Sequence, residues 1–233
     1  MDHINELLNQ ILSKNPFLSY SDALCICLRN EIILLHLKPG DTINESRLSS
    51  QLNISRSPIK MALDTLMNEG FIVRPKGKMA VVSNLSREDY HHIMEARITI
   101  ESQAAYLAAK KITNKELDQL KKLLNEFSIS AQNSDSALFE KCDVRFHEII
   151  VKASGNPYLI KMHEIINPKL YRYRNYLVSV YSEHGPLYGT PTHHHIAIYN
   201  ALSSHYSSIA QDEMIKDISR MSRSIGLIPL SYQ

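Results

Sequence analysis

The chain has 233 residues, of which 44% are hydrophobic and 21% charged, and its formal net charge is +2 at pH 7. This composition is typical of a folded protein of one or two domains and excludes disordered and collagen-like chains. The longest strongly apolar run covers residues 32–35, whereas a membrane span needs about 18 apolar residues. No secretory signal pattern is visible and the three cysteines form no CxxC pair. We therefore expect a cytoplasmic protein with no membrane partner.

The first 83 residues follow the pattern of a helical extension and a winged helix-turn-helix. Residues 1–19 have apolar side chains at helical spacing and predict a short N-terminal extension. Helices are expected over residues 21–36, after Asn44 as N-cap, and from Ser55, whose hydroxyl can cap the third helix. The apolar period then changes from 3.6 to 2, which predicts a β-hairpin with a basic tip. Residues 20–83 are thus predicted to form three helices plus a β-hairpin.

The third predicted helix, residues 56–69, has one apolar face and carries small polar and cationic side chains at its N-terminal end. That arrangement suits a helix that reads the major groove of DNA. Residues 51–80 carry five basic and two acidic side chains, so the basic surplus of the chain is local. An ordinary solvated face is the alternative for a single helix of this kind. A module that binds protein in place of DNA is a further alternative, and the basic side chains argue against it.

Every long segment after Asn84 has helical periodicity. The chain is therefore expected to be mainly α, with residues 84–233 forming an antiparallel bundle of about six helices that makes up a second domain. The expected helices cover residues 87–110, 114–131, 136–154, 157–182, 192–204 and 206–224.

Asp143 and His147 are four residues apart and share a helix face that looks into the predicted bundle. His195 lies at the start of a second apolar stripe and should also point inward, although His194 can take its place. A buried carboxylate and buried imidazoles are costly unless they are paired or bound to a metal. If they converge, they form an N/O site suited to Zn²⁺, Mn²⁺ or Ni²⁺. The alternative is that each is an ordinary core or surface residue.

Residues 20–83 resemble the winged helix-turn-helix of the GntR-type bacterial transcription regulators. The similarity includes the segment 37–41, the segment 55–63 with the sequence Ser-Arg-Ser-Pro-Ile-Lys-Met-Ala-Leu, and Glu69-Gly70-Phe71-Ile72. The resemblance implies an operator of double-stranded DNA. The family usually has arginine where this chain has Ser46, and Arg47 follows immediately. The residues that the resemblance places on DNA are Arg47, Ser55, Arg56, Ser57, Lys60, Lys76 and Gly77.

The remainder is similar to the FadR-like subgroup of that family, in which the helical FCD-type domain binds ligand and dimerises. The matching motifs include Glu95-Ala96-Arg97, Asp143-x-x-Phe146-His147, Gly155-Asn156-Pro157 and His195-x-x-Ile198. Metal-binding members usually carry a last histidine ligand where this chain has Asp217, so the resemblance implies Asp143, His147, His195 and Asp217 as metal ligands. Arg97 and Arg172 are candidates to hold a carboxylate effector, because guanidinium pairs with carboxylate in a bidentate fork. A structural ion pair is the alternative role for Arg97.

The resemblance, together with the basic helix and wing, implies a homodimeric DNA-binding repressor that reads an inverted-repeat operator. A small carboxylate effector, seated in the bundle at a divalent metal, would change its affinity for DNA. We expect no organic cofactor and no enzymatic activity. The alternative function is a metal-dependent enzyme that uses Asp143, His147 and His195, but the sequence offers no evident general base or nucleophile motif beside them.

Overall fold

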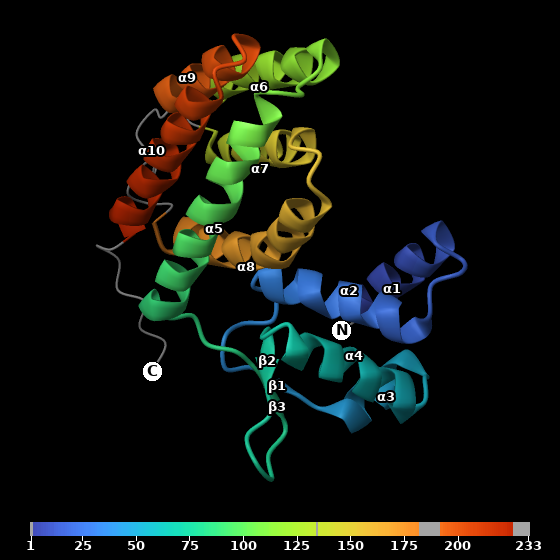
Figure 1. The fold of residues 1–233 in the computed structure, drawn as a ribbon. Coiled ribbons are helices and arrows are strands. Elements are labelled where there is room, and N and C mark those ends of the chain that lie inside the picture. Colours follow the sequence, from blue (N-terminus) through green and yellow to red (C-terminus); the bar gives the residue numbers. More distant parts are fainter. Residues whose placement is uncertain (1, 134, 182–191, 226–233) are drawn as a thin grey trace. The chain divides into compact units, whose positions relative to one another are not determined.

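The computed structural model describes residues 2–133, 135–181 and 192–225 (Figure 1). These residues divide into two compact units. Unit 1 runs to Ser86 and includes Tyr171–Tyr176, and unit 2 contains Arg87–Leu170 and continues from Leu177. The prediction of a mainly helical chain with a small β element is confirmed. No described helix combines the length and the apolar character that crossing a membrane requires.

Unit 1 contains the predicted helices of the winged helix-turn-helix, preceded by one further helix. Ser19 caps the helix α2, where its hydroxyl accepts a hydrogen bond from the Asp22 amide at 3.1 Å. Asn44 caps α3 in the same way, with 3.0 Å between its side-chain oxygen and the Arg47 amide. The tight turn between α3 and α4 is closed by Asn53 in the left-handed conformation, with φ 52°. The elements are α1 (Asp2–Lys14), α2 (Tyr20–Ile33), β1 (Thr42–Ile43), α3 (Glu45–Leu52), α4 (Arg56–Asn68), β2 (Ile72–Val73) and β3 (Ala80–Val82).

The core of unit 1 forms where the apolar stripes of α2 and α4 meet. Leu24 and Leu28 of α2 and Ile59, Leu63 and Leu66 of α4 are all buried, which is the pattern expected from their i, i+3, i+4 spacing. The extension α1 packs on α2 and adds Ile4 and Leu8 to the same core. Apolar burial on the inner face of α4 leaves its polar face toward solvent.

The sheet of unit 1 has three antiparallel strands in the order β1-β3-β2, where we had predicted a two-stranded hairpin. Thr42 pairs with Val81, and Val81 also pairs with Val73 on the other side. The additional strand β1 has only two residues, which is too short to show an alternating pattern in the sequence. It follows the turn at Gly40, which has φ 86° and donates its amide to the Val82 carbonyl at 3.0 Å.

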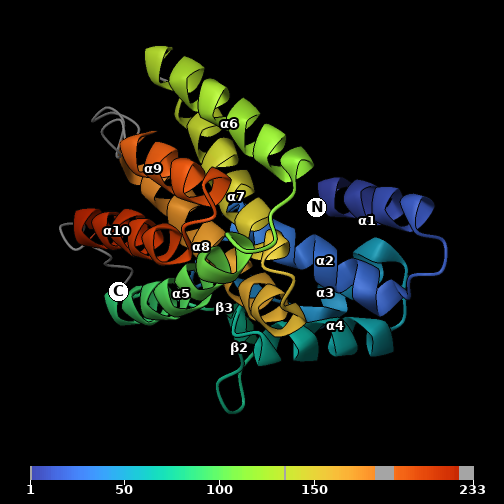
Figure 2. The same ribbon diagram turned by 45° about the horizontal axis from the view of Figure 1, so that its top comes forward.

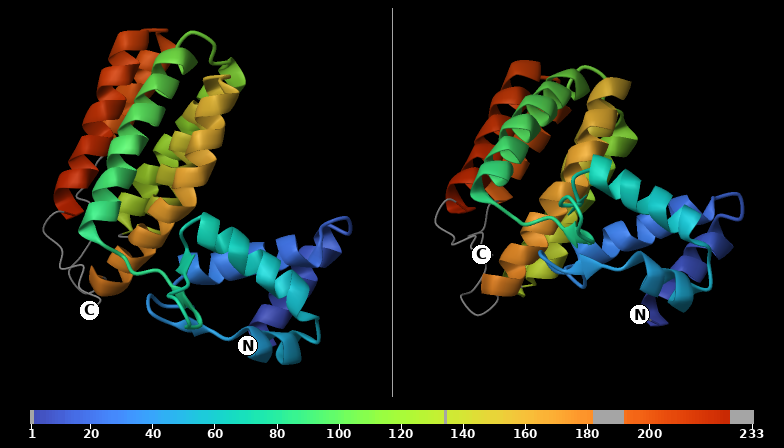
Figure 3. Two further views of the ribbon diagram at one scale, coloured as in Figure 1. Left: turned by 60° about the horizontal axis from the view of Figure 1, so that its bottom comes forward. Right: turned by 90° about the horizontal axis from the view of Figure 1, so that it is seen from below.

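Unit 2 is a helical bundle (Figures 2 and 3). Helix α5 packs against α10 and α7, and α6 packs against α7 and α9. Thr113 and Glu116 form a capping box at the start of α6, and Asp135 caps α7. Each of these caps lies at a break that the sequence predicted. The elements are α5 (Arg87–Ala108), α6 (Asn114–Gln132), α7 (Ser136–Ala153), α8 (Pro157–Tyr181), α9 (Thr192–Ser203) and α10 (Ser207–Ile225).

Candidate functional site

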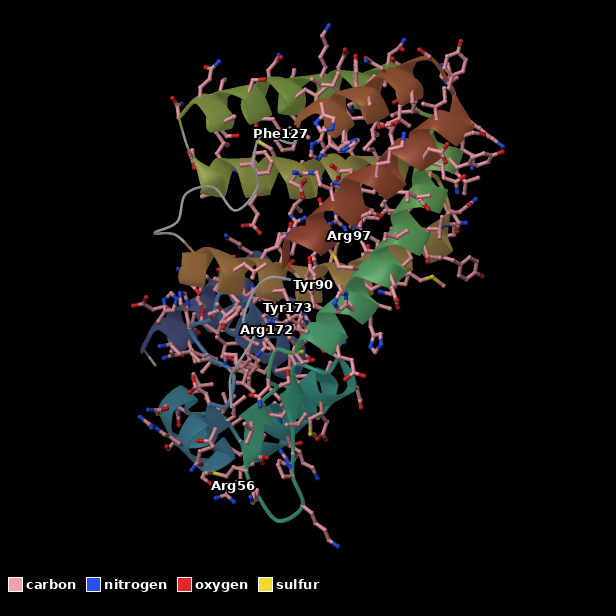
Figure 4. All side chains as sticks on the ribbon, turned by 90° about the vertical axis from the view of Figure 1, so that its left-hand side faces the viewer. Arg56, Tyr90, Arg97, Phe127, Arg172 and Tyr173 are labelled. Atoms are coloured by element: carbon pink, nitrogen blue, oxygen red, sulfur yellow. The ribbon has the colours of Figure 1, made fainter. Side chains whose placement is uncertain are left out.

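A cationic surface lies at the N-terminal end of α4 in unit 1. Ser55 stands at the N-cap position, but its side chain makes no capping hydrogen bond, so the expected cap is wrong. The amides of the first turn of α4 therefore receive no acceptor from Ser55, and such amides are suited to bind an anion. Arg56 lies at the surface of unit 1 (Figure 4). All seven residues that we predicted to contact DNA are exposed: Arg47, Ser55, Arg56, Ser57, Lys60, Lys76 and Gly77.

The wing is the loop between β2 and β3, which extends beyond the sheet (Figure 1). Lys76 and Gly77 lie at its tip, and Gly77 has φ 73°. At the base of the wing, the Arg74 guanidinium pairs with the Glu45 carboxylate at the start of α3. This pair ties the wing to the helix-turn-helix within the same unit. The wing and the N-terminal end of α4 thus carry the predicted cations on one rigid scaffold.

Four predicted ligands meet in the interior of unit 2. Asp143 and His147 come from α7, His195 from α9 and Asp217 from α10, and each is at most 2% exposed. Their ligand atoms all lie within 4.8 Å of one another. His195 Nε2 is 3.1 Å from Asp143 Oδ1, and His147 Nε2 is 3.3 Å from Asp217 Oδ2. We call these four residues the bundle cluster.

The geometry of the bundle cluster fits a tetrahedral metal ion. Four donors about 2.0–2.1 Å from a tetrahedral Zn²⁺ lie roughly 3.3–3.4 Å from each other. The measured separations between histidine nitrogens and carboxylate oxygens are 3.1, 3.3, 3.7 and 3.9 Å. His147 Nε2 and Asp217 Oδ2 are buried and face each other at 3.3 Å without a well-aligned hydrogen bond. Buried polar atoms without such a bond are costly, and a shared cation would satisfy both.

His194 lies outside the bundle cluster. Its ring is half-buried, and its Nδ1 faces Glu213 at 3.3 Å. His195, its neighbour in the chain, is fully buried among aromatic rings. The ring of Phe127 stacks on that of His195 with centroids 4.5 Å apart, and Phe146 meets it edge-on at 4.9 Å. Aromatic packing of this kind fixes the direction in which the His195 nitrogens point.

Glu101 of α5 forms a hydrogen bond with the His147 nitrogen that is not part of the bundle cluster. His147 Nδ1 donates to Glu101 Oε2 at 2.6 Å, because a carboxylate can only accept. Glu101 Oε1 in turn accepts from Arg97 Nε at 2.6 Å. A histidine whose second nitrogen donates to a carboxylate is the usual support of a metal-bound imidazole. Arg97, Glu101 and His147 thus form a buried chain that leads to the bundle cluster (Figure 4 labels Arg97).

The charges of Arg97, Glu101 and His147 shift the pKa values of the Glu101 carboxyl and the His147 imidazole. Burial alone would raise the pKa of Glu101, but the charges of Arg97 and His147 outweigh it and hold that pKa far below the usual range. Burial alone would lower the pKa of His147, but the facing carboxylate of Glu101 raises it to about 9. Burial would likewise raise the pKa of Asp217, and the nearby His195 and His147 lower it. The carboxylates of Glu101 and Asp217 are therefore ionised at neutral pH.

A depression of about 190 Å³ lies beside Arg97 and Glu101 in unit 2. Its walls include Arg97, Glu101, His163, Asn167 and Leu170. His163 Nε2 lies 3.7 Å from Glu101 Oε1, and burial lowers the pKa of its imidazole. The space is smaller than the 300–1,000 Å³ typical of pockets for drug-sized ligands. Much of this volume is open to solvent and none of it encloses room for a water molecule, so a ligand would bind here only if the lining side chains rearranged.

Arg172, the second predicted effector anchor, belongs to unit 1 rather than to this depression. Its guanidinium donates to the hydroxyl of Ser83 at 2.8 Å and also to the Ser83 carbonyl. The neighbouring Tyr173 hydroxyl donates to the Ser86 carbonyl at 3.0 Å. Figure 4 labels both residues on α8. These contacts give Arg172 a role in holding residues 83–86.

His163 and Phe127 are the site residues to which sequence reasoning assigned no role. Glu101 was considered only as a neighbour of Arg97, whose alternative role as a structural ion pair is what the structure shows. The spacing of Arg97 and Glu101 was a usable signal, because residues four apart on a helix face each other. His163 stands in the apolar stripe of α8 with Ile166 and Leu170, which was a weaker signal. Phe127 has no sequence signal, since an aromatic residue in an amphipathic helix is usual in a core.

Two protein-family models match this chain. A model described as the FCD domain matches residues 92–220, which is more than half of the chain. A second model, described as bacterial regulatory proteins of the gntR family, matches residues 24–82. The chain belongs to the GntR family and carries an FCD domain. In this GntR protein the bundle cluster and its supporting chain therefore lie within the FCD domain. The FadR-like subgroup stays a prediction.

Relatives of this GntR protein are named as regulators of transcription. The Nta operon transcriptional regulator of Aminobacter aminovorans is 32% identical over 58% of this chain and 64% of its own length. The gluconate operon transcriptional repressor of Bacillus licheniformis is 28% identical over 60% of this chain and 58% of its own length. The chain thus matches less than two thirds of the length of either relative. Both names describe regulators and neither describes an enzyme.

Solved structures share the fold. E. coli McbR/YncC has a TM-score of 0.69 with 19% identity, covering 88% of this chain and 96% of that one. A GntR transcriptional regulator from Rhodococcus has a TM-score of 0.70 with 16% identity, covering 91% of this chain and 100% of that one. At these identities the similarity concerns the fold alone.

Proposed function

We propose that this GntR protein is a DNA-binding repressor that acts as a homodimer. Two copies of unit 1 would read the half-sites of an inverted repeat, each with the N-terminal end of α4 in the major groove. The observation that carries this proposal is the exposed cluster of Arg56, Ser57 and Lys60 at the uncapped start of α4, next to a basic wing. Arginine matches the O6 and N7 acceptors of guanine, and the wing lysines match phosphate.

Selection of bound duplexes from a random DNA pool tests this proposal. We expect enrichment of two inverted half-sites whose centres lie about 10 bp, or a multiple of that, apart. The mass of the complex should correspond to two chains per duplex. Enrichment of a single asymmetric site, or of no sequence at all, would contradict the dimeric repressor.

We propose that the bundle cluster holds one divalent cation, Zn²⁺, Mn²⁺ or Ni²⁺, through Asp143, His147, His195 and Asp217. The support is the tetrahedral spacing of the four donors and their burial in the bundle. The bound cation would offer a positive centre to a carboxylate oxygen. Glu101 accepts from Nδ1 of His147, so once a cation displaces the Nε2 proton the neutral ring presents its Nε2 lone pair to the cluster.

The effector that fits this surrounding is a small carboxylate. Arg97 lines the depression and donates through Nε to Glu101, so the other N–H groups of its guanidinium can pair with a carboxylate there. Because the depression encloses no room for a ligand as it stands, the effector would enter together with a rearrangement of the lining side chains. Such an effector changes DNA affinity only as far as it binds the DNA-competent and DNA-incompetent states differently.

Substituting Arg97 by lysine should weaken effector binding and leave the fold in place. Lysine keeps the charge beside Glu101 but lacks the planar fork. One hydrogen bond to a charged group is worth about 1.5–3 kcal/mol, so we expect about 10–100-fold weaker binding. The measurement is the rise in melting temperature of zinc-loaded protein over a concentration series of citrate, gluconate and lactate.

The exposed Arg145→Lys variant of the same domain is the matched control and should respond like the wild type. If the wild type responds to one of these acids and Arg97→Lys responds equally, Arg97 is only a structural partner of Glu101.

A further inference from the structure

A second group of side chains with metal-ligating atoms lies in unit 1. It consists of His3 on α1, Glu31 on α2 and His36 in the turn after α2. The ligand atoms of these three residues lie within 4.8 Å of one another. His3 Nε2 is 3.6 Å from Glu31 Oε1, and His36 Nδ1 is 3.3 Å from both oxygens of Glu31. Three segments of the chain therefore converge on one carboxylate.

The local fold brings His36 back over Glu31. Leu35 adopts a left-handed conformation with φ 61°, which is rare for a residue with a branched side chain. The Leu37 amide then donates to the Glu31 carbonyl at 3.0 Å and closes the turn. The ring of His36 thus lies on the side of α2 where the Glu31 side chain emerges.

The packing of α1 brings His3 to the same carboxylate. Ile4 and Leu8 of α1 are buried in the core of unit 1. The Cys27 thiol of α2 is 3.7 Å from the Ile4 carbonyl, to which it donates. Because Ile4 is anchored there, the neighbouring His3 faces Glu31. Burial raises the pKa of the Cys27 thiol to about 12, so Cys27 stays a neutral thiol and is not a fourth ligand.

The spacing and the exposure both suit a cation. Donors of a tetrahedral Zn²⁺ lie roughly 3.3–3.4 Å apart, and the histidine–glutamate separations here are 3.3 and 3.6 Å. The Glu31 side chain is 6% exposed, whereas those of His3 and His36 are 56% and 54% exposed. The carboxylate is thus fixed by the core, while the two imidazoles face solvent and leave an entry path and open coordination positions for water.

Without a metal, imidazole N–H groups can satisfy Glu31, and His36 Nδ1 lies within hydrogen-bond distance of both Glu31 oxygens. A divalent cation would take the place of these protons and bind the same nitrogens and carboxylate. Two imidazoles and one carboxylate are also a common donor set for borderline divalent metals.

We propose that His3, Glu31 and His36 form a second divalent-cation site, of the Zn²⁺ class, which ties helix α1 to α2. The site is open to solvent and lies in unit 1, so it differs from the buried bundle cluster in both accessibility and location. Its occupation would hold the N-terminal end of α1 on the helix-turn-helix core. The proposal does not depend on whether the bundle cluster binds metal.

Titration of the metal-free full-length chain with Co²⁺ tests the proposal, because four-coordinate Co²⁺ has strong visible absorption. We expect one equivalent to be lost in His36→Gln and in Glu31→Gln, with at least about tenfold weaker binding, since even loss of an outer-shell partner costs about 10–100-fold. His195→Gln should keep this equivalent. The matched control is His92→Gln, which removes an exposed histidine outside both groups.

Hydrogen exchange gives a second measurement that reports position. Addition of Zn²⁺ should slow amide exchange in the first turns of α1 in the wild type and in His92→Gln, but not in His36→Gln. The proposal is overturned if His36→Gln and Glu31→Gln bind Co²⁺ like the wild type. It is also overturned if every equivalent disappears in His195→Gln, or if α1 exchange does not respond to Zn²⁺. If only the bundle cluster fails to bind metal, the wild type will bind one equivalent of Co²⁺, and His36→Gln will abolish that binding.

Discussion

Substituting His195 by alanine should abolish the stabilisation of the bundle by Zn²⁺ that we propose, whereas substituting His194 by alanine should preserve it. The two residues are neighbours on α9, but only His195 faces Asp143 and Asp217. A ligand that binds only the folded state at 100 times its dissociation constant stabilises it by about 2.7 kcal/mol. We expect that increment in the His194→Ala variant and none in the His195→Ala variant.

The measurement is urea unfolding with and without Zn²⁺, with both variants made in a His36→Gln background so that only the bundle cluster contributes. Metal-free His195→Ala should itself be destabilised, because it leaves a cavity between Phe127 and Phe146. The comparison therefore uses the zinc-dependent increment rather than the absolute stability. Equal increments in the two variants would show that the bundle cluster does not hold the metal.

Substituting Arg56 by alanine should cost about 1–3 kcal/mol of operator binding and relax the preference for one base. Arg56 is exposed in the first turn of α4, where a guanidinium can reach a base edge. Lys76→Ala should act differently, because its partner at the wing would be a phosphate. We expect it to weaken binding to all duplexes about equally and to lower the slope of log affinity against log salt by about 1.

Fluorescence anisotropy with the selected operator and with a scrambled duplex, over a salt series, separates these effects. Arg145→Ala, an exposed arginine of the bundle, is the matched control and should bind like the wild type. If Arg56→Ala lost affinity for the scrambled duplex as much as for the operator, its contact would be with the backbone. If it lost none, α4 would not be the reading helix.

The helices could be predicted from the sequence because each has a sustained apolar stripe and a recognisable break. Thr113, Asp135 and Asn44 act as caps at boundaries that the pattern had indicated. The strand β1 was missed because two residues contain no periodicity. The cap expected from Ser55 failed for a different reason: a serine before a helix makes a cap possible, but the rotamer decides whether the bond forms.

The candidate metal donors could be inferred from the sequence because the spacing of three of them shows which face of a helix they occupy. The residues that hydrogen-bond to these donors could not be inferred in this way. Glu101 reaches His147 from a helix that is 46 residues distant in the chain, and only the packing of α5 on α7 brings them together. The group of His3, Glu31 and His36 was missed entirely, since it depends on the left-handed turn at Leu35 and on the docking of α1.

The left-handed Asn53 restricts which substitutions the turn of the helix-turn-helix can accept. Its φ of 52° sets the angle at which α4 leaves α3. Glycine, asparagine and aspartate adopt this conformation readily, whereas other L-residues lose roughly 1–2 kcal/mol there. A branched side chain at this position would therefore redirect a helix that it does not touch. Backbone geometry therefore restricts substitution at residue 53 to a few amino acids, whichever operator the protein reads.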